Sequence, residues 1–308
     1  ENDRALCVLP IYHINGLCVT VMGTLVSAST LVMPYRFSVS TFWETIVRYA
    51  CSWFSAVPTQ YAYILNNDAP VGDLSHLRFA RSASAPLSPD IHRRFEERFK
   101  VPIIETMGLT ETGSQITTNP LPPAERKIGS PGAAYGNEIM VADAEFAAVP
   151  TGQTGEILVR GKNVMQGYFK QPEETAKTIT KDGWLRTGDL GYMDEDGFIY
   201  VSGRIKELII KGGENIAPRE IDEALLEHPS ILEAAAFAVP CENYGERVEA
   251  CIRFKDKSDV GIDVLMAHCV SKLGKFKSPD QIHVMEDLPK GPSGKVQRLK
   301  LYGMIYAA

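Results

Sequence analysis

From Ala5 to Thr112 the sequence alternates short apolar segments with segments whose apolar residues recur at helical spacing. The strand-like segments are ALCVLP, STLVMP, CSWFSAV, LRFARS and VPIIETM. The helical ones include TFWETIVRYA and SPDIHRRFEERF, where Ser88 is a candidate N-cap and Pro89 takes the first helical position. Because parallel strands need a crossover connection, usually a helix, this alternation predicts a mostly parallel α/β sheet.

The segment from Ala5 to Tyr35 contains no Asp, Glu, Lys or Arg, so a membrane span must be considered. Its first half is interrupted by Pro10 and Asn15, and the remaining apolar stretch is shorter than the roughly 20 residues of a span. We therefore expect a buried strand–helix–strand passage and no transmembrane segment.

The pattern changes after Ser114. Residues 127–201 contain short strands separated by Gly and Pro turns, which is typical of an antiparallel or barrel-like part. From Lys206 onward, strands and helices alternate in a segment the size of a small α+β domain. The predicted organisation is a large domain over 1–205, part α/β and part β-rich, followed by a small domain over 206–308.

Composition excludes several classes. With 44% hydrophobic and 23% charged residues in 308, the chain can bury a core like an ordinary soluble protein. A net charge of −6 argues against a nucleic-acid-binding protein. The six cysteines form no C-x-x-C pair or zinc-type cluster, which favours free thiols in a reducing, cytoplasmic setting.

Two loops that follow predicted strands carry residues suited to a nucleotide. ETMGLTET, which begins at Glu105, offers hydroxyls for phosphate oxygens and carboxylates for Mg²⁺, although a capped polar loop is an alternative. RSASAPL, which begins at Arg81, has small residues that let a flat ring approach, although it is also compatible with a simple tight turn.

Later motifs are equally ambiguous when taken singly. Asp189 follows a Thr-Gly turn and Arg204 a Ser-Gly turn; an Asp can accept from ribose hydroxyls and an Arg can donate to ribose or phosphate. DEDG between them is predicted to be a hairpin turn. Lys295 lies in GPSGKVQR, which lacks the P-loop spacing and could be solvated charge, and His13 in LPIYHINGL could be structural.

In their order and spacing, however, these motifs resemble the adenylate-forming enzymes. That family includes acyl-CoA synthetases, 4-coumarate and benzoate CoA ligases, firefly luciferase and peptide-synthetase adenylation domains. The motifs that carry the resemblance are LPIYHINGL, RSASAPL, ETMGLTET, GEILVRG, GWLRTGDLG, GRIKELIIKGGENIAPREID and GPSGKVQR. The resemblance implies ATP-dependent activation of a carboxylic acid to an acyl-adenylate, with Mg²⁺, followed by transfer to the thiol of coenzyme A.

The resemblance also implies roles for individual residues. Thr110 would contact the α-phosphate, Glu111 would hold Mg²⁺, and His13 would lie beside the acyl pocket. Asp189 and Arg204 would bind ribose, and Lys295 would reach the acyl carboxylate and α-phosphate. Lys206 would be a hinge, and Gly212 and Gly213 would approach coenzyme A. The expected nucleotide-binding residues are Ser84, Ala85, Pro86, Glu105, Thr106, Met107, Gly108, Thr110, Asp189, Arg204 and Lys295.

Three departures qualify the resemblance. Met107 stands where the family usually has Tyr, and Ala83–Ser84 replaces a usual Gly-Gly pair. The family's Ser/Thr/Gly-rich phosphate loop, which precedes the His motif, does not occur in the sequence, so the chain is expected to be a fragment with little activity of its own.

The motifs do not identify the acid substrate, which could be a small dicarboxylic, an aryl or a fatty acid. GSQITTNPLPPAERKIG somewhat resembles the corresponding stretch of oxalate–CoA ligases. Alternatives to a CoA ligase are an adenylation domain serving a carrier protein and a non-catalytic nucleotide-binding fragment.

Overall fold

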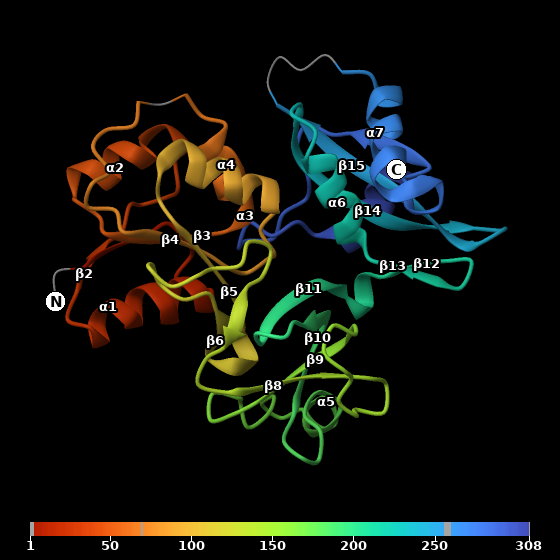
Figure 1. Ribbon diagram of the computed structural model, residues 1–308, viewed down its shortest axis with the longest axis horizontal. Helices are drawn as coiled ribbons and strands as arrows, with labels where there is room; N and C mark the ends of the chain where they lie inside the picture. Colours follow the sequence, from red (N-terminus) through yellow and green to blue (C-terminus); the bar gives the residue numbers. More distant parts are fainter. Residues whose placement is uncertain (1–2, 69, 256–259, 308) are drawn as a thin grey trace. The chain divides into compact units, whose positions relative to one another are not determined.

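The computed structural model describes residues 3–68, 70–255 and 260–307 (Figure 1). The chain divides into two compact units, Glu1–Val201 and Ser202–Ala308. The domain limits expected from the sequence, 1–205 and 206–308, stay a prediction, and their outermost residues lie outside the described part.

The first half of unit 1 is the predicted parallel sheet. Its strands lie in the order β2 (Thr30–Val32), β1 (Arg4–Cys7), β3 (Trp53–Ala56), β4 (Phe79–Ser82) and β5 (Ile103–Leu109), each parallel to its neighbour. The helices of one face are α2 (Phe42–Arg48), preceded by the 3-10 turn η2 (Val39–Thr41), α3 (Pro58–Leu65) and α4 (Pro89–Phe99). Figure 1 shows these three helices together on one side of the sheet. Their aromatic side chains pack on one another and on the sheet: Phe95 of α4 contacts Tyr61 of α3 and Phe54 of β3.

The charge-free segment forms the expected strand, helix and strand, but the helix differs from the expectation. It consists of a π-helix, η1 (Asn15–Met22), followed by one α-helical turn, α1 (Gly23–Val26). The passage is also not buried throughout, because Leu25 and Val26 are 68% and 85% exposed. Among the described residues, no helix is both long enough and apolar enough to cross a membrane.

Ser88 was expected to cap α4 and does occupy the N-cap position. Its side chain makes no capping hydrogen bond, and its hydroxyl is buried without a partner among the described residues. The helix starts here because Pro89, whose fixed φ suits the first turn and which has no N–H to satisfy, follows directly.

The sheet continues with antiparallel strands to a total of eleven. Beyond β5 the order is β6 (Ser114–Thr118), β7 (Gly132–Ala134), β11 (Phe198–Arg204), β10 (Leu185–Met193), β9 (Gly155–Arg160) and β8 (Glu138–Ala142). Helix α5 (Pro172–Thr178) lies between β9 and β10 in the chain. The predicted change from parallel to antiparallel strands is therefore confirmed, and it falls between β5 and β6.

The DEDG hairpin turn is also confirmed. Asp194 Oδ1 accepts the backbone N–H groups of Asp196 (3.0 Å) and Phe198 (2.9 Å), while Gly197 takes a φ of 80° that favours glycine. The ammonium of Lys127 bridges the Asp194 and Asp196 carboxylates. The carboxylates of the turn are therefore neutralised by a lysine from another part of unit 1 and stabilise the turn itself.

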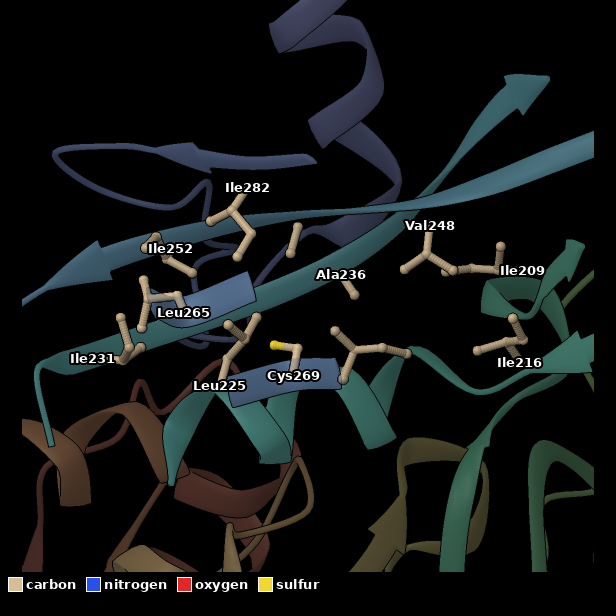
Figure 2. Packing of buried hydrophobic residues seen from close by; sticks show 12 residues of the cluster. Ile209, Ile216, Leu225, Ile231, Ala236, Val248, Ile252, Leu265, Cys269 and Ile282 are labelled. Atoms are coloured by element: carbon tan, nitrogen blue, oxygen red, sulfur yellow. The ribbon is translucent and has the colours of Figure 1, made fainter. Parts of the chain in front are cut away.

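Unit 2 forms the small α+β domain expected from the sequence. Its sheet contains β13 (Glu214–Ile216), β12 (Ile209–Lys211), β15 (Gly245–Phe254) and β14 (Ile231–Cys241), with β16 (Gln281–Val284) parallel to β15. The helical segments are η4 (Ile205–Glu207), α6 (Pro218–Leu226), α7 (Ile262–Lys277), η5 (Arg298–Lys300) and α8 (Leu301–Tyr306). In Figure 2, Leu225 of α6 and Leu265 of α7 pack with Ile231 and Ile252 in one buried cluster.

Candidate active site

Strands β4 and β5 bring two of the predicted nucleotide-binding loops together. Ser82, the last residue of β4, is in register with Glu105 of β5. Glu105 Oε1 accepts the N–H of Leu87 at 3.0 Å, and the Thr106 hydroxyl donates to the carbonyl of Ser82 at 3.4 Å. These contacts attach the loop of Ser84, Ala85 and Pro86 to the strand that carries Glu105 to Gly108.

Gly108 is required by the close approach of two strands. A Cβ at this position would lie 1.6 Å from the carbonyl oxygen of Ser114 on β6, and the β5–β6 register shifts between Met107 and Gly108. A side chain is therefore excluded for a backbone reason, independently of any ligand. Met107 is buried in a cluster with Val141, Ile157 and Ile199.

The end of β5 presents a carboxylate without a cationic partner. Thr110 and Glu111 form the 3-10 turn η3 (Thr110–Thr112), and Glu111 Oε1 accepts the hydroxyl of Tyr168 at 2.9 Å. No Lys or Arg of the described part forms an ion pair with Glu111. Partial burial, together with the bond to Glu111, raises the pKa of Tyr168, so this phenol stays a donor.

The residues around Glu111 fit a divalent cation held partly by other molecules. Within the described residues, no group of three or more His, Cys, Asp or Glu side chains could hold a metal ion. One carboxylate is the protein share that Mg²⁺ commonly takes at phosphate sites, where phosphate oxygens and water complete its coordination. Glu111 therefore suits Mg²⁺ that arrives with a nucleotide.

His13 lies in the turn after β1 and is half-buried. Its Nδ1 accepts the N–H of Asn15 at 3.3 Å, which leaves the proton of a neutral ring on Nε2. Burial lowers the pKa of His13, so the neutral form prevails at pH 7.

Asp189 is placed by a bulge in β10, and this corrects the turn expected before it. The pairing of β10 with β9 shifts register between Arg186 and Leu190, and Gly188 has a φ of 71°. The hydroxyl of Thr187 accepts the N–H of Asp189 at 3.0 Å, and only 7% of Asp189 is exposed. The Thr-Gly pair is thus an irregularity inside a strand rather than a turn.

The remaining predicted residues belong to unit 2. Arg204 ends β11, so the Ser-Gly turn expected before it is also wrong: Ser202 and Gly203 continue the strand. Lys206 is exposed in η4. Gly212 and Gly213 form the tip between β12 and β13 with φ of 60° and 85°, a conformation that disfavours other residues.

Lys295 lies in a loop that is closed by a hydrogen bond: the backbone N–H of Gly291 donates to the backbone carbonyl of Lys295 at 2.8 Å. Arg298, three residues later, pairs with Asp222 Oδ2 of α6 at 2.6 Å and with Glu207 Oε2 of η4 at 3.3 Å. Arg298 therefore joins the Lys295 loop to the segment that carries Lys206.

Two residues of unit 1 were not predicted. Tyr168 follows Gly167 in a polar stretch, and nothing local identifies it as a partner of Glu111. Arg81 begins RSASAPL, where composition alone gives it no role, yet it is 6% exposed and donates hydrogen bonds to Asn15 and Ser55. Both contacts depend on pairings distant in the sequence.

Comparison with known proteins identifies the class. Residues 1–169 match the model of the AMP-binding enzyme family, and residues 220–295 match that of the AMP-binding enzyme C-terminal domain. The chain belongs to the AMP-binding enzyme family. The parallel sheet, its antiparallel continuation and the separate small α+β unit agree with the fold of adenylate-forming enzymes.

Particular relatives are acid–CoA ligases. The chain is 52% identical over 302 residues to a sulfoacetate–CoA ligase of Cupriavidus necator, covering 97% of the chain and 58% of that protein. It is 39% identical over 297 residues to an oxalate–CoA ligase of Saccharomyces cerevisiae, covering 96% and 54%. The structure of ATP-bound MatB from Rhodopseudomonas palustris matches with a TM-score of 0.91 at 32% identity, over 98% of this chain and 60% of that one. The chain thus spans somewhat more than half the length of the relatives it matches.

Proposed function

We propose that the whole protein is an AMP-forming acid–CoA ligase that uses ATP, Mg²⁺ and coenzyme A. The observation that carries the proposal is the joining of the Ser84 loop to β5 through Glu105 and Leu87. Directly after β5, Glu111 offers a carboxylate that has no Lys or Arg partner among the described residues. Its sequence relatives named above are CoA ligases, and its six cysteines are free thiols, as expected for a cytoplasmic enzyme.

In the first half-reaction an oxygen of the substrate carboxylate attacks the α-phosphorus of ATP, and the bond from that phosphorus to the bridging oxygen breaks, releasing pyrophosphate. Phosphoryl transfer of this kind is promoted chiefly by positioning and by neutralising charge. We assign Thr110 to hold an α-phosphate oxygen and Lys295 to neutralise the carboxylate and α-phosphate. Glu111 would hold Mg²⁺, which supplies further neutralisation when bound.

The nucleoside is assigned to the remaining nucleotide-binding residues. The small side chains of the Ser84 loop and the β5 segment from Thr106 to Gly108 would enclose the adenine. Asp189 would accept both ribose hydroxyls, and Arg204 would donate to the ribose. Met107 would offer a polarisable thioether to the purine in place of an aromatic ring.

In the second half-reaction the sulfur of coenzyme A attacks the acyl carbonyl carbon, and AMP leaves with the bonding electrons. His13 would border the acyl group in its neutral form, and so would not pair with the incoming thiolate. Lys206 is the proposed hinge between the half-reactions, and Gly212–Gly213 the proposed contact for coenzyme A.

The full-length protein carrying Lys295→Ala tests this assignment. Loss of a cation that stabilises charge in the transition state should slow acid-dependent pyrophosphate release by about 10²- to 10³-fold. Thioester formation from supplied acyl-adenylate and coenzyme A should stay within about threefold of wild type. Equal loss of both steps would contradict the separate role of Lys295, and absence of coenzyme A-dependent AMP release in wild type would contradict the proposed function.

A further inference from the structure

Arg81 of β4 is a buried cation whose bonds go to neutral groups. Its Nη1 donates to Asn15 Oδ1 at 2.7 Å and to Ser55 Oγ at 3.1 Å. Asn15 and Ser55 are themselves 3% and 0% exposed. In the part of the chain that the structure describes, these are the hydrogen bonds that the guanidinium makes.

No carboxylate compensates this charge among the described residues, since the ion pairs found there do not include Arg81. Its cross-strand neighbours in the sheet are Ser55 on β3 and Ile104 on β5. Burial lowers the pKa of Arg81 to about 10, which still leaves the group charged at pH 7. A buried charge is costly unless it is paired, so this arrangement indicates an anion from outside the protein.

Two other cations with little exposure have acidic partners among the described residues. Arg298 pairs with Asp222 and Glu207, and Lys211 pairs with Asp280 at 3.3 Å. Arg81 differs from them because, within the described residues, its hydrogen-bond partners are one side-chain amide and one hydroxyl. An arginine that binds an anionic ligand needs such an environment, because a carboxylate of the protein would compete with the ligand for the guanidinium.

The location links this charge to the proposed acyl site. Asn15, which holds Arg81 through its side-chain oxygen, donates its side-chain amide to Ser84 Oγ at 3.2 Å and its backbone N–H to His13 Nδ1 at 3.3 Å. A single residue therefore connects Arg81 both to the loop proposed for the nucleotide and to the histidine proposed for the acyl group. All four residues belong to unit 1.

We infer that Arg81 is the specificity-determining counter-charge for a second anionic group on a short acid substrate, a sulfonate or a second carboxylate. The inference rests on the proposed function, in which the first carboxylate is the one activated. A planar guanidinium held through one nitrogen keeps its remaining N–H groups in a fixed geometry that matches such an anion. Sulfoacetate and oxalate, named for two relatives, each carry this second charge at pH 7.

The test is the selectivity of the full-length protein between acids of one and two charges. Coenzyme A-dependent AMP release is measured with sulfoacetate, oxalate and malonate, and with acetate, propionate and glycolate as singly charged acids of similar size. Wild type should favour at least one doubly charged acid by 100-fold or more in kcat/KM. The first three acids also show whether a sulfonate or a carboxylate is preferred.

Arg81→Met should abolish most of that preference, and Arg81→Lys should keep part of it. Asn15→Asp is the sharper variant, because it places a carboxylate on the guanidinium with almost no change in shape. Asn15→Asp should lower kcat/KM for doubly charged acids at least tenfold, while the midpoint of thermal unfolding does not fall. Arg78→Met is the matched control: Arg78 is exposed, pairs with Asp3, and its loss should leave selectivity unchanged.

Two results would overturn the inference while leaving the proposed function standing: a wild-type preference for singly charged acids, or equal losses for both kinds of acid in Arg81→Met and Asn15→Asp. Absence of AMP release with every acid and coenzyme A would instead overturn the proposed function, and this inference with it.

Discussion

Glu96 should be one of the largest single electrostatic contributions to the stability of unit 1. Its Oε1 accepts hydrogen bonds from His92 Nε2 (3.1 Å), from the guanidinium of Arg126 and from the N–H of Ile103 (2.7 Å). The carboxylate therefore ties α4 to the first residue of β5, the strand that carries the proposed nucleotide-binding residues. Burial alone would raise the pKa of Glu96, but these three donors outweigh it and hold the pKa at about 2, against an ordinary 4.5.

The pKa shift has a direct consequence for stability. Because the folded-state pKa lies below the unfolded one, the stabilisation is complete above about pH 4.5 and is lost as the pH falls toward 2. A shift of this size corresponds to a free energy on the order of 3 kcal/mol at pH 7. By pH 4 about 1 kcal/mol of it should already be gone.

The perturbation is Glu96→Gln, measured by urea unfolding at pH 7 and pH 4. The variant should lose about 1–3 kcal/mol of unfolding free energy at pH 7, and the gap to wild type should narrow by about 1 kcal/mol at pH 4. Glu97→Gln, one residue along on the exposed side of α4, is the control and should change little at either pH. A Glu96→Gln loss equal to that of Glu97→Gln, or one that does not change between the two pH values, would refute the reasoning.

Two further changes probe the loop at the site and the core of unit 2. Ser84 has a φ of 76°, a left-handed backbone conformation that favours glycine. Ser84→Gly and Ser84→Ala both lose the hydrogen bond from Asn15, but only the glycine variant relieves the backbone strain, so chemical denaturation should show it to be more stable than the alanine variant by about 1 kcal/mol. Equal stabilities of the two variants would contradict this reasoning. Ile252→Ala should lower the unfolding free energy by about 2–5 kcal/mol because Ile252 is fully buried. Val284 lies in register beside it on β16 but is 55% exposed, so Val284→Ala should lower the unfolding free energy by less than about 1 kcal/mol. Similar losses for the two variants would contradict the packing argument.

Much of the fold follows from patterns that are local in the sequence. The alternation of apolar strands and helices predicts the parallel sheet, and the Gly-rich spacing after Ser114 predicts the antiparallel strands. The DEDG turn is determined by its own residues, since Asp194 bonds within the turn and Gly197 accepts the left-handed backbone. Where the determining interactions lie within a few residues, the sequence is sufficient.

Where the sequence suggested a turn and the structure has a strand, a distant partner decided the local geometry. The Thr-Gly pair before Asp189 has the composition of a turn, but pairing with β9 holds it in a bulged strand. Ser88 is a separate case: it is a good N-cap residue by type and occupies the N-cap position, yet its hydroxyl makes no capping bond and has no partner among the described residues. Composition identifies which residues permit an irregularity, whereas the tertiary partner decides which irregularity forms.

The same reasoning explains why Arg81 could not be recognised from the sequence. An arginine in RSASAPL is indistinguishable by composition from a surface residue, and Arg78, three residues earlier, is indeed exposed and paired with Asp3. What separates the two is the parallel register that sets Ser55 beside Arg81 and the helix start that brings Asn15 over it. Strand alternation puts Arg81 on the same face as Phe79 and opposite to Ala80, so a one-residue shift of register would remove the charge from Asn15 altogether. The substrate specificity proposed for this protein thus depends on sheet register, and it is a property of the folded strand rather than of the motif.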